Sequence, residues 1–331
     1  MRKALRRVFI AAFALGALAA AWLIYFSSTP VSLPVTPYEF TVPNGAGLKT
    51  VARQLASDGL FIEGESFWIL GRLLGKARSI QAGTYRLDKP HTPLEILDKL
   101  ARGDVVFLDM LFVEGTTFKQ WLAQLASHPR VRQTLPGRTE AELRALFGTG
   151  EQTPEGWFFP DTYRFAPGAS DADILKRAHA AMKKRLADAW SARSAGTPLK
   201  TPYEALILAS IVEKETGLAA ERPMIAAVFV NRLRRGMRLQ TDPTVIYGMG
   251  EHFDGNIRKK DLSADTPWNT YTRDGLPPTP IAMPGAGSLK AAVNPAETAA
   301  LYFVARGDGS HEFTRSLEEH NRAVAKYQLG K

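Results

Sequence analysis

Two glutamates lie close together at the end of an apolar helix, where one of them could act as an acid. Thr201-Pro202-Tyr203-Glu204 has the capping-box pattern of a helix start, as Thr92-Pro93-Leu94-Glu95 does earlier in the chain. The residues after Glu204, ALILASIVEKET, are apolar until Glu213. At about 100° of rotation per residue, Glu215 continues the face of Leu208, whereas Glu213 lies about 200° away from Glu215. Lost hydration raises the pKa of a carboxyl group at the mouth of a buried face, so Glu215 suits general-acid chemistry. The alternative is an ordinary solvated helix end.

Polar and aromatic side chains follow this helix in segments that would suit a sugar polymer. Sugar rings stack on aromatic side chains, and their hydroxyl and acetamide groups need neutral hydrogen-bond partners. The segments TPWNTY (266–271) and GLPPTPIAMPG (275–285) could equally be rigid structural loops, and EGWFFPDTY (155–163) could be core or groove wall. The candidates for binding substrate or orienting Glu215 are Glu213, Gln240, Asp242, Tyr247, Asn269, Tyr271, His311, Phe313 and Asn321.

Several other chemistries are excluded by residues that the sequence lacks. It has no Cys, which excludes disulfides, thiolate metal sites, iron–sulfur clusters and a cysteine nucleophile. His311-Glu312 does not begin an HExxH motif, because residue 315 is Arg, and neither a G-x-S-x-G motif nor a P-loop is present. We therefore expect no metal and no cofactor. The alternative is a zinc site made of His311, His320 and Asp242.

The N-terminus has the pattern of a single membrane anchor. Val8–Phe26 contains 19 residues without a charge, which as a helix is roughly 28 Å long, about the thickness of the hydrocarbon core. The cations Arg2, Lys3, Arg6 and Arg7 precede it and predict a cytoplasmic N-terminus. The alternative is a signal peptide cleaved after Ala17-Leu18-Ala19. These four cations also supply much of the net charge of +9, so we expect no nucleic-acid partner.

The rest of the chain predicts an α+β protein of two parts. We divide the chain into a cytoplasmic tail (1–7), a transmembrane helix (8–26), a proline-rich linker (27–37), a β-α module (38–135) and a second domain (136–331). The module repeats a strand, a polar turn and a short helix three times, starting at 38, 83 and 110. From residue 138 onward the pattern is mainly helical, with short strands and proline-rich loops, and includes a long amphipathic helix over 171–192.

Several of these segments together resemble one known family. ASIVEKET, RLQTDPTVIYG, NTY followed by GLPP, and LYFVA with the later HEF and HN resemble the YceG-like, membrane-anchored endolytic murein transglycosylases. GTYRL and EGWFFPDTY are also similar to segments of this family. The resemblance covers nearly the whole chain. It implies an inner-membrane protein with a single-pass anchor, a LysM-like β-α module and a lysozyme-like helical catalytic domain in the periplasm.

The resemblance also implies a reaction and a catalytic residue. Such an enzyme is a carbon–oxygen lyase that cleaves the MurNAc-β-1,4-GlcNAc bond within peptidoglycan strands and leaves 1,6-anhydro-MurNAc ends, which terminates glycan strands. The second Glu of the E-K-E-T motif, here Glu215, is the implied acid and then base. Two positions depart from the family pattern, Thr279 and Trp268, and neither is the acid. Cell-wall synthases are implied as partners.

Two alternatives to this reading remain at the level of sequence. The first is a hydrolytic muramidase on the same fold, with Asp242 as a second carboxylate that activates water. The second is a non-catalytic, membrane-tethered scaffold that binds glycan strands. The mass of the reaction products separates the transglycosylase from the hydrolase. The scaffold would release no ends, and its binding to the sacculus would be unchanged by Glu215→Gln.

Overall fold

The computed structural model describes residues 2–150 and 152–330, which form two compact units. The first unit holds the chain up to Leu108 together with Arg164–Pro167, and the second holds Asp109–Tyr163 and the chain from Gly168 onward. The division at 108 lies before the boundary of 135 expected from sequence. The third predicted β-α repeat, which starts at 110, therefore falls in the second unit.

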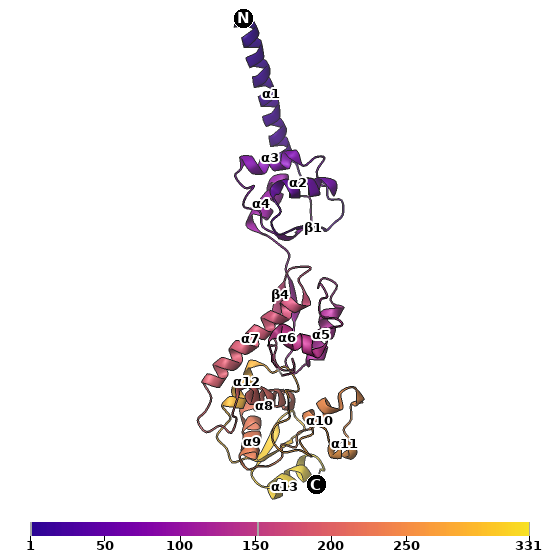
Figure 1. Ribbon diagram of the computed structural model, residues 1–331, viewed down its shortest axis with the longest axis vertical. Helices are drawn as coiled ribbons and strands as arrows, with labels where there is room; N and C mark the ends of the chain where they lie inside the picture. The colour runs from indigo at the N-terminus through magenta and orange to yellow at the C-terminus, as the bar shows by residue number, and fades with distance from the viewer. Residues whose placement is uncertain (1, 151, 331) are drawn as a thin grey trace. The chain divides into compact units, whose positions relative to one another are not determined.

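The first unit begins with a long apolar helix. Its elements are α1 (Arg2–Ser28), β1 (Tyr38–Val42), α2 (Leu48–Ser57), α3 (Glu65–Leu73), β2 (Gly83–Leu87) and α4 (Pro93–Arg102). Within the part of the chain described, α1 is the one helix long and apolar enough to cross a membrane, over Leu5–Ser28. The expected helix over 8–26 is thus confirmed as a helix. Figure 1 shows it leaving the first unit, with α3 beside its foot.

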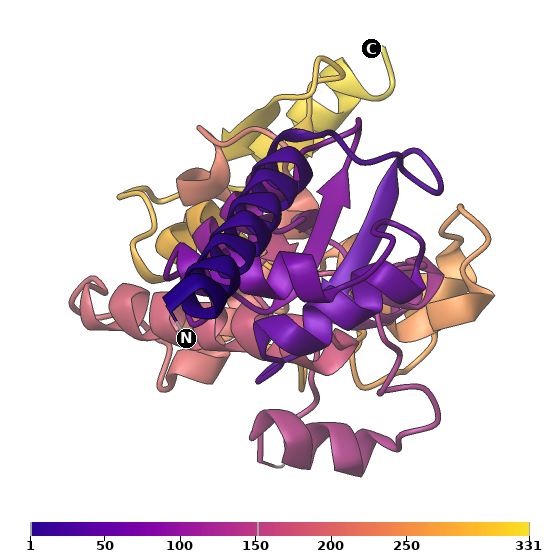
Figure 2. The ribbon, with the colours of Figure 1, turned by 90° about the horizontal axis from the view of Figure 1, so that it is seen from above.

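The core of the first unit lies between a small sheet and three helices. β1 and β2 pair antiparallel, from Tyr38 opposite Leu87 to Val42 opposite Gly83, and lie side by side in Figure 2. Phe40 and Tyr85 stack on this sheet, and the apolar faces of α2, α3 and α4 cover it. The predicted capping box of α4 is confirmed: Thr92 and Glu95 each accept the other's backbone N–H. The first unit thus combines helices with a small sheet, and its capping residues begin the helices whose apolar faces form the core.

A second pair of strands marks the division between the units. β3 (Leu108–Leu111) and β4 (Thr162–Phe165) form a two-stranded sheet. The boundary between the units falls within both strands.

The second unit is mainly helical, as the sequence predicts. Its helices are α5 (Phe118–Ser127), α6 (Glu140–Phe147), α7 (Asp171–Ser191), α8 (Pro202–Glu215), α9 (Arg222–Arg234), α10 (Asp242–Met249), the short 3₁₀ helix η1 (Gly250–His252), α11 (Lys259–Ser263), α12 (Ala286–Val293) and α13 (Leu317–Tyr327). β5 (Tyr302–Ala305) and β6 (His311–Thr314) pair antiparallel.

Helix α8 is the centre of this unit. Every residue from Ala205 to Val212 is buried, and α7, α9, α10 and α12 pack around the helix. Its expected N-cap is confirmed, since Thr201 Oγ1 accepts the N–H of Glu204 at 3.2 Å. The reciprocal half of the expected capping box is wrong: the Glu204 carboxylate accepts the N–H of Lys200 instead. A helix surrounded on all sides is a rigid support for the side chains at its end.

Candidate active site

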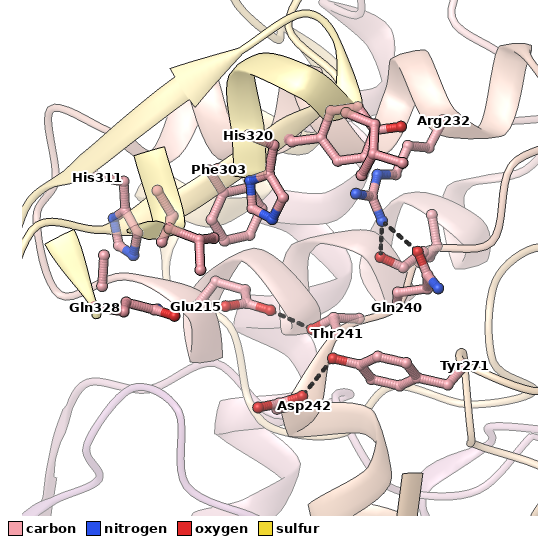
Figure 3. Close-up of a pocket in the computed structure, with 16 residues that line it drawn as sticks. Glu215, Arg232, Gln240, Thr241, Asp242, Tyr271, Phe303, His311, His320 and Gln328 are labelled. Atoms are coloured by element: carbon pink, nitrogen blue, oxygen red, sulfur yellow. Dashed lines mark hydrogen bonds between the residues drawn. The ribbon is translucent and has the colours of Figure 1, made fainter. Parts of the chain in front are cut away.

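A pocket of about 450 Å³ opens in the second unit at the end of α8 (Figure 3). Its walls come from three places that are far apart in the sequence: the end of α8, the segment 239–242 with Tyr271, and β5, β6 and α13. The described residues that line it include Glu215, Arg232, Gln240, Asp242, Tyr271, Tyr302, Phe303, His311 and His320. Carboxylate, amide, phenol and imidazole groups therefore face one cavity.

Glu215 enters this pocket because it is the last residue of α8. The buried face of Leu208, Ile211 and Val212 leads directly to it, as the helical spacing predicts. The next residue, Thr216, is extended, so the helix ends where the carboxyl group reaches the cavity. The position of this side chain is thus set by the burial of the helix behind it.

The surroundings of the Glu215 carboxyl group bring its pKa close to neutral pH. Burial raises its pKa to about 7, and the neighbouring negative charge of Asp242 acts in the same direction. The hydroxyl of Thr241 donates a hydrogen bond to Oε1, which favours the ionised form, as do the nearby His311 and Arg232. A pKa in this range lets one group both give and take a proton.

Glu213 leaves α8 on the other side and has a different environment. Its carboxylate pairs with the guanidinium of Arg222 at 3.1 Å and accepts the N–H of Gly285 at 2.8 Å. These partners occupy both carboxylate oxygens, and the side chain is only 5% exposed to solvent. Glu213 therefore fixes the segment around Gly285 to α8, while Glu215 alone of the two lines the pocket.

A buried arginine organises the wall that carries Gln240. Arg232 donates to the carbonyls of Leu301 at 2.7 Å and Leu239 at 2.8 Å, and more weakly to Oε1 of Gln240 at 3.5 Å. Gln240 has a φ of 49°, a left-handed conformation that is uncommon outside glycine. Its N–H donates to the carbonyl of Thr270, which fixes the turn from the other side. This arrangement points the Gln240 amide into the pocket (Figure 3).

Asp242 and Tyr271 form a second polar pair on the same wall. The Tyr271 hydroxyl donates to Oδ1 of Asp242 at 2.6 Å (Figure 3). Asn269 holds Tyr271 in place, because its Oδ1 accepts the Tyr271 N–H and its amide donates to the carbonyls of Asp261, Leu262 and Ala264. The Asn269 side chain is completely buried and supports the loop from within.

The opposite wall is aromatic. Phe303 lies on β5, where it pairs with Phe313, and His311 is the first residue of β6, opposite Ala305. The rings of Phe303 and His311 meet edge to face. Nδ1 of His311 lies 2.7 Å from Oε2 of Glu221, and the His311 N–H donates to the other carboxylate oxygen at 2.9 Å. Glu221 thus fixes the ring of His311 at the pocket. His320 stacks on Tyr302 nearby.

The candidates expected from sequence separate into two groups. Gln240, Asp242, Tyr271 and His311 lie in the pocket with Glu215. The others lie elsewhere: Glu213 pairs with Arg222, Tyr247 donates to Glu155, Asn269 is buried in its loop, Phe313 packs beside Phe303, and Asn321 is exposed on α13.

The structure adds residues that the sequence reasoning missed. Arg232, Thr241 and Glu221 contact or hold pocket residues, yet each lies in an ordinary helical or loop pattern without a local signal. Thr241 alone could have been singled out, because it lies between two candidates. A further buried carboxyl group, Glu155, accepts the N–H of Phe118 and the hydroxyl of Tyr247.

The proline-rich and aromatic segments have mainly structural positions. Phe158, Phe159 and Tyr163 are buried core residues, and Ile281, Ala282 and Met283 of the proline-rich segment are buried too. Thr279 and Trp268, the two departures from the family pattern, are in contact, since the Trp268 indole N–H donates to the Thr279 hydroxyl at 2.8 Å.

Within residues 2–150 and 152–330, His, Asp and Glu side chains form no group of three that could hold a metal ion. His311 is instead bonded to Glu221, and Asp242 to Tyr271.

Comparisons with known proteins agree on one family. The profile of the YceG-like family matches residues 40–326. A Bacillus subtilis protein named endolytic murein transglycosylase is 33% identical over 311 residues, covering 88% of this chain and 85% of its own. A Streptococcus pneumoniae protein of the same name is 26% identical over 86% of this chain, which spans 57% of that longer protein.

A solved structure is similar as well. The crystal structure of a yceG-like protein from Listeria monocytogenes has 29% identity and a TM-score of 0.55, covering 87% of this chain and 99% of its own. With the profile match over most of the sequence, these similarities show that the chain belongs to the YceG-like family.

Proposed function

We propose that this protein is an endolytic lytic transglycosylase of peptidoglycan in which Glu215 is the general acid and then the base. The observation that carries the proposal is the position of Glu215: a carboxyl group with a pKa near 7, on the end of a buried helix, in a pocket of about 450 Å³. The names of the relatives from Bacillus subtilis and Streptococcus pneumoniae support the substrate and the reaction class.

In the first step, protonated Glu215 donates its proton to the glycosidic oxygen between MurNAc and GlcNAc. The bond between C1 of MurNAc and this oxygen breaks, and GlcNAc leaves with a hydroxyl group. Positive charge then develops at C1, where the acetamide oxygen of the substrate and the new Glu215 carboxylate stabilise it. The enzyme therefore needs no second carboxylate for this step.

In the second step, the C6 hydroxyl of the same MurNAc attacks C1. The Glu215 carboxylate takes the hydroxyl proton, and the 1,6-anhydro ring closes. Glu215 returns to its protonated form, and no water is consumed. A pKa near 7 suits both steps, because neither the acid nor the base form is strongly disfavoured near neutral pH.

The other pocket residues have positioning roles in this proposal. Gln240, held by Arg232, and His311, held by Glu221, offer directed hydrogen-bond partners to hydroxyl and acetamide groups. Phe303 offers an apolar ring face for a sugar. The first unit, which we expect to be LysM-like, would bind or position the glycan strand.

A hydrolytic muramidase is the second candidate, because Asp242 lines the same pocket as Glu215. A water molecule activated by Asp242 would attack C1 in place of the C6 hydroxyl. In the structure, the Asp242 carboxylate accepts the Tyr271 hydroxyl at 2.6 Å, which occupies one of its oxygens.

The experiment compares products from purified, uncrosslinked glycan strands for the wild type, Glu215→Gln and Glu213→Gln. We expect anhydro ends from the wild type, and a loss of at least about 100-fold in kcat for Glu215→Gln, as for a removed general acid. Glu213→Gln is the matched control on the same helix and keeps the acid. Products heavier by one water would establish the hydrolase. Strand binding without cleavage by the wild type would establish a scaffold, and full activity of Glu215→Gln would exclude the proposed role.

The proposed location is the inner membrane, with α1 as a single-pass anchor and both units on the periplasmic side. The cations at residues 2, 3, 6 and 7 favour a cytoplasmic N-terminus. The second unit then faces peptidoglycan, the proposed substrate.

A further inference from the structure

An exposed apolar surface lies beside the foot of α1 in the first unit. It consists of Ile62, Ile69, Leu73 and Leu74, which we call the α3 surface, and their exposed fractions are 98, 42, 69 and 47%. Single exposed apolar residues are common on proteins, whereas clusters of them mark interaction sites, and these four lie on or beside one short helix. The question is what covers it.

The position of α1 relative to α3 points to the partner. The Trp22 indole N–H donates to the Ser66 hydroxyl at 3.1 Å, and Phe26 packs on Phe61 at 5.6 Å between ring centroids. Trp22 lies near the end of the apolar span Leu5–Ser28, where indole rings prefer the level of the lipid headgroups. The start of α3 is therefore held at that level.

The exposed face of α3 continues from this contact. Ser66, Ile69 and Leu73 follow at helical spacing of three and four residues, so they lie along one face. Figure 1 shows α3 running across the foot of α1 on the side of the first unit from which α1 leaves. A face that starts at the headgroup level and runs across the anchor stays near the membrane surface along its length.

The polar residues around this face fit a bilayer interface. Lys49 and Arg72 lie over the ring of Trp68, at 4.8 and 5.3 Å from its centroid, where they can contact lipid phosphates. Glu63 and Glu65 lie at the α1 end of α3, but Glu63 accepts backbone N–H groups there and Glu65 pairs with Lys49 at 3.7 Å. Glu65 thus shares Lys49 with the phosphates, and the negative charge of Glu63 faces the positive end of the α3 dipole.

A cavity between α1 and the loop before α3 adds a place for lipid. It measures about 370 Å³ and is lined in part by Trp22, Tyr25, Phe26, Leu60, Phe61 and Ile62. Its apolar walls join the end of the span to the most exposed residue of the α3 surface. An acyl chain beside α1 would fill such a space.

We propose that the α3 surface inserts into the headgroup region of the outer leaflet of the membrane that α1 spans. Phospholipid is the one occupant, with its acyl region against Ile62, Ile69, Leu73 and Leu74 and its phosphates near Lys49 and Arg72. The contact holds the first unit flat against the membrane. This inference rests on the proposed anchor function of α1.

The test uses the lack of Cys in the chain, which makes single labelling sites specific. The variants Leu15→Cys, Ile62→Cys, Leu73→Cys and Arg102→Cys of the full chain each receive an environment-sensitive fluorophore, in nanodiscs of phosphatidylethanolamine and phosphatidylglycerol that hold one copy. Leu15 reports the centre of the span. Arg102 is the exposed control, because it is the last residue of α4, a helix that also contacts α1 but is not part of the α3 surface.

We expect blue-shifted emission, and quenching by spin-labelled lipids, at Leu15, Ile62 and Leu73. At Ile62 and Leu73, lipids that carry the spin label near the headgroup should quench most strongly. Arg102 should report water. If Ile62 and Leu73 match Arg102 while Leu15 is embedded, the proposed surface is wrong and the anchor stands. If Leu15 also reports water, the anchor itself fails. A shift at Ile62 and Leu73 that occurs only with several copies per particle would indicate self-association and also overturn the proposal.

Discussion

Two buried carboxyl groups of the second unit have similar pKa values but different surroundings. Burial raises the pKa of both Glu215 and Glu155 to about 7. Glu215 faces the pocket, whereas Glu155 accepts the N–H of Phe118 at the start of α5 and the hydroxyl of Tyr247. Burial therefore shifts both pKa values alike, but the two residues differ in role. Glu215 is the proposed catalytic group, whereas Glu155 connects α5 to α10 by hydrogen bonds.

The proposed role of Glu215 predicts a pH profile. The acid must be protonated when the bond breaks, so kcat should fall as the pH rises through about 7, the pKa of this group. Thr241→Val removes a hydrogen bond that favours the carboxylate, so the pKa of Glu215 and the alkaline limb of the profile should move to higher pH. Rates of anhydro-end formation against pH check this. An unchanged limb in the variant would contradict the assignment.

The environment of Glu155 predicts how stability changes with pH. Its folded pKa of about 7 exceeds the unfolded value of 4.5, so the folded state binds more protons between these values. The stabilising contribution is complete below about pH 4.5 and is lost as the pH rises through about 7, by on the order of 3 kcal/mol.

Glu155→Gln should reduce this dependence, because the amide does not titrate and its oxygen can still accept both hydrogen bonds. The contribution of Glu215, which has a similar pKa, should remain. Denaturant unfolding of the full chain in detergent, from pH 4 to 8, measures the difference. Glu140→Gln, at an exposed position, is the control and should keep the slope of the wild type. Equal slopes for the wild type and Glu155→Gln would show that Glu155 does not titrate in this range.

Helix α8 positions the site because it is tied to its neighbours by polar as well as apolar contacts. Ser210, fully buried, donates to the carbonyl of Ile207 and accepts the N–H of Ile281 at 3.0 Å. Glu213 binds the N–H of Gly285 at the other end of the same proline-rich segment. These two side chains lie on the face of α8 opposite Glu215, so the segment 281–285 supports the helix from behind the pocket.

This arrangement predicts the effect of Ser210→Ala. The substitution leaves the buried N–H of Ile281 without its partner, which should lower the free energy of unfolding by about 1–3 kcal/mol. Thermal unfolding of the two proteins measures the loss. Ser263→Ala at the exposed end of α11 should leave the unfolding temperature nearly unchanged. A loss no larger than that of this control would mean that water or another group satisfies Ile281.

The whole molecule joins an apolar N-terminal helix to the pocket in which we propose that a carbohydrate binds. The first unit packs on the foot of α1 through Trp22 and Phe26, and the second carries Glu215. In our proposal the membrane anchor comes first along the chain, the membrane-binding α3 surface follows, and the catalytic unit comes last. The enzyme would therefore work on glycan strands near the membrane.

The proposed orientation of the chain predicts the effect of removing its N-terminal charges. Replacing Arg2, Lys3, Arg6 and Arg7 with Gln removes the bias that keeps the N-terminus in the cytoplasm. We expect a smaller fraction of the protein with its second unit outside, measured by protease digestion of this unit in spheroplasts. The control replaces Arg235, Lys259 and Lys260, exposed cations far from the span in sequence, and should not change digestion. Unchanged digestion in both variants would contradict the role of the N-terminal charges.

The sequence by itself determined the features that depend on local spacing. The 3.6-residue period placed Glu215 on the buried face of α8 and Glu213 on the other, and the uncharged run after Arg7 marked α1. Capping residues such as Thr92 and Thr201 marked helix starts to within a residue. These signals act between residues a few positions apart, so they are readable without the fold.

The tertiary structure decided which distant residues meet. Four of the candidates line the same pocket as Glu215, namely Gln240, Asp242, Tyr271 and His311. Two others, Tyr247 and Asn269, instead make hydrogen bonds that support neighbouring segments. In the sequence, all six are polar or aromatic residues without a feature that separates the two groups. The difference comes from Arg232, Glu155 and Glu221, whose hydrogen bonds join segments far apart in sequence. Such bonds depend on how the helices pack, and no local period encodes that packing.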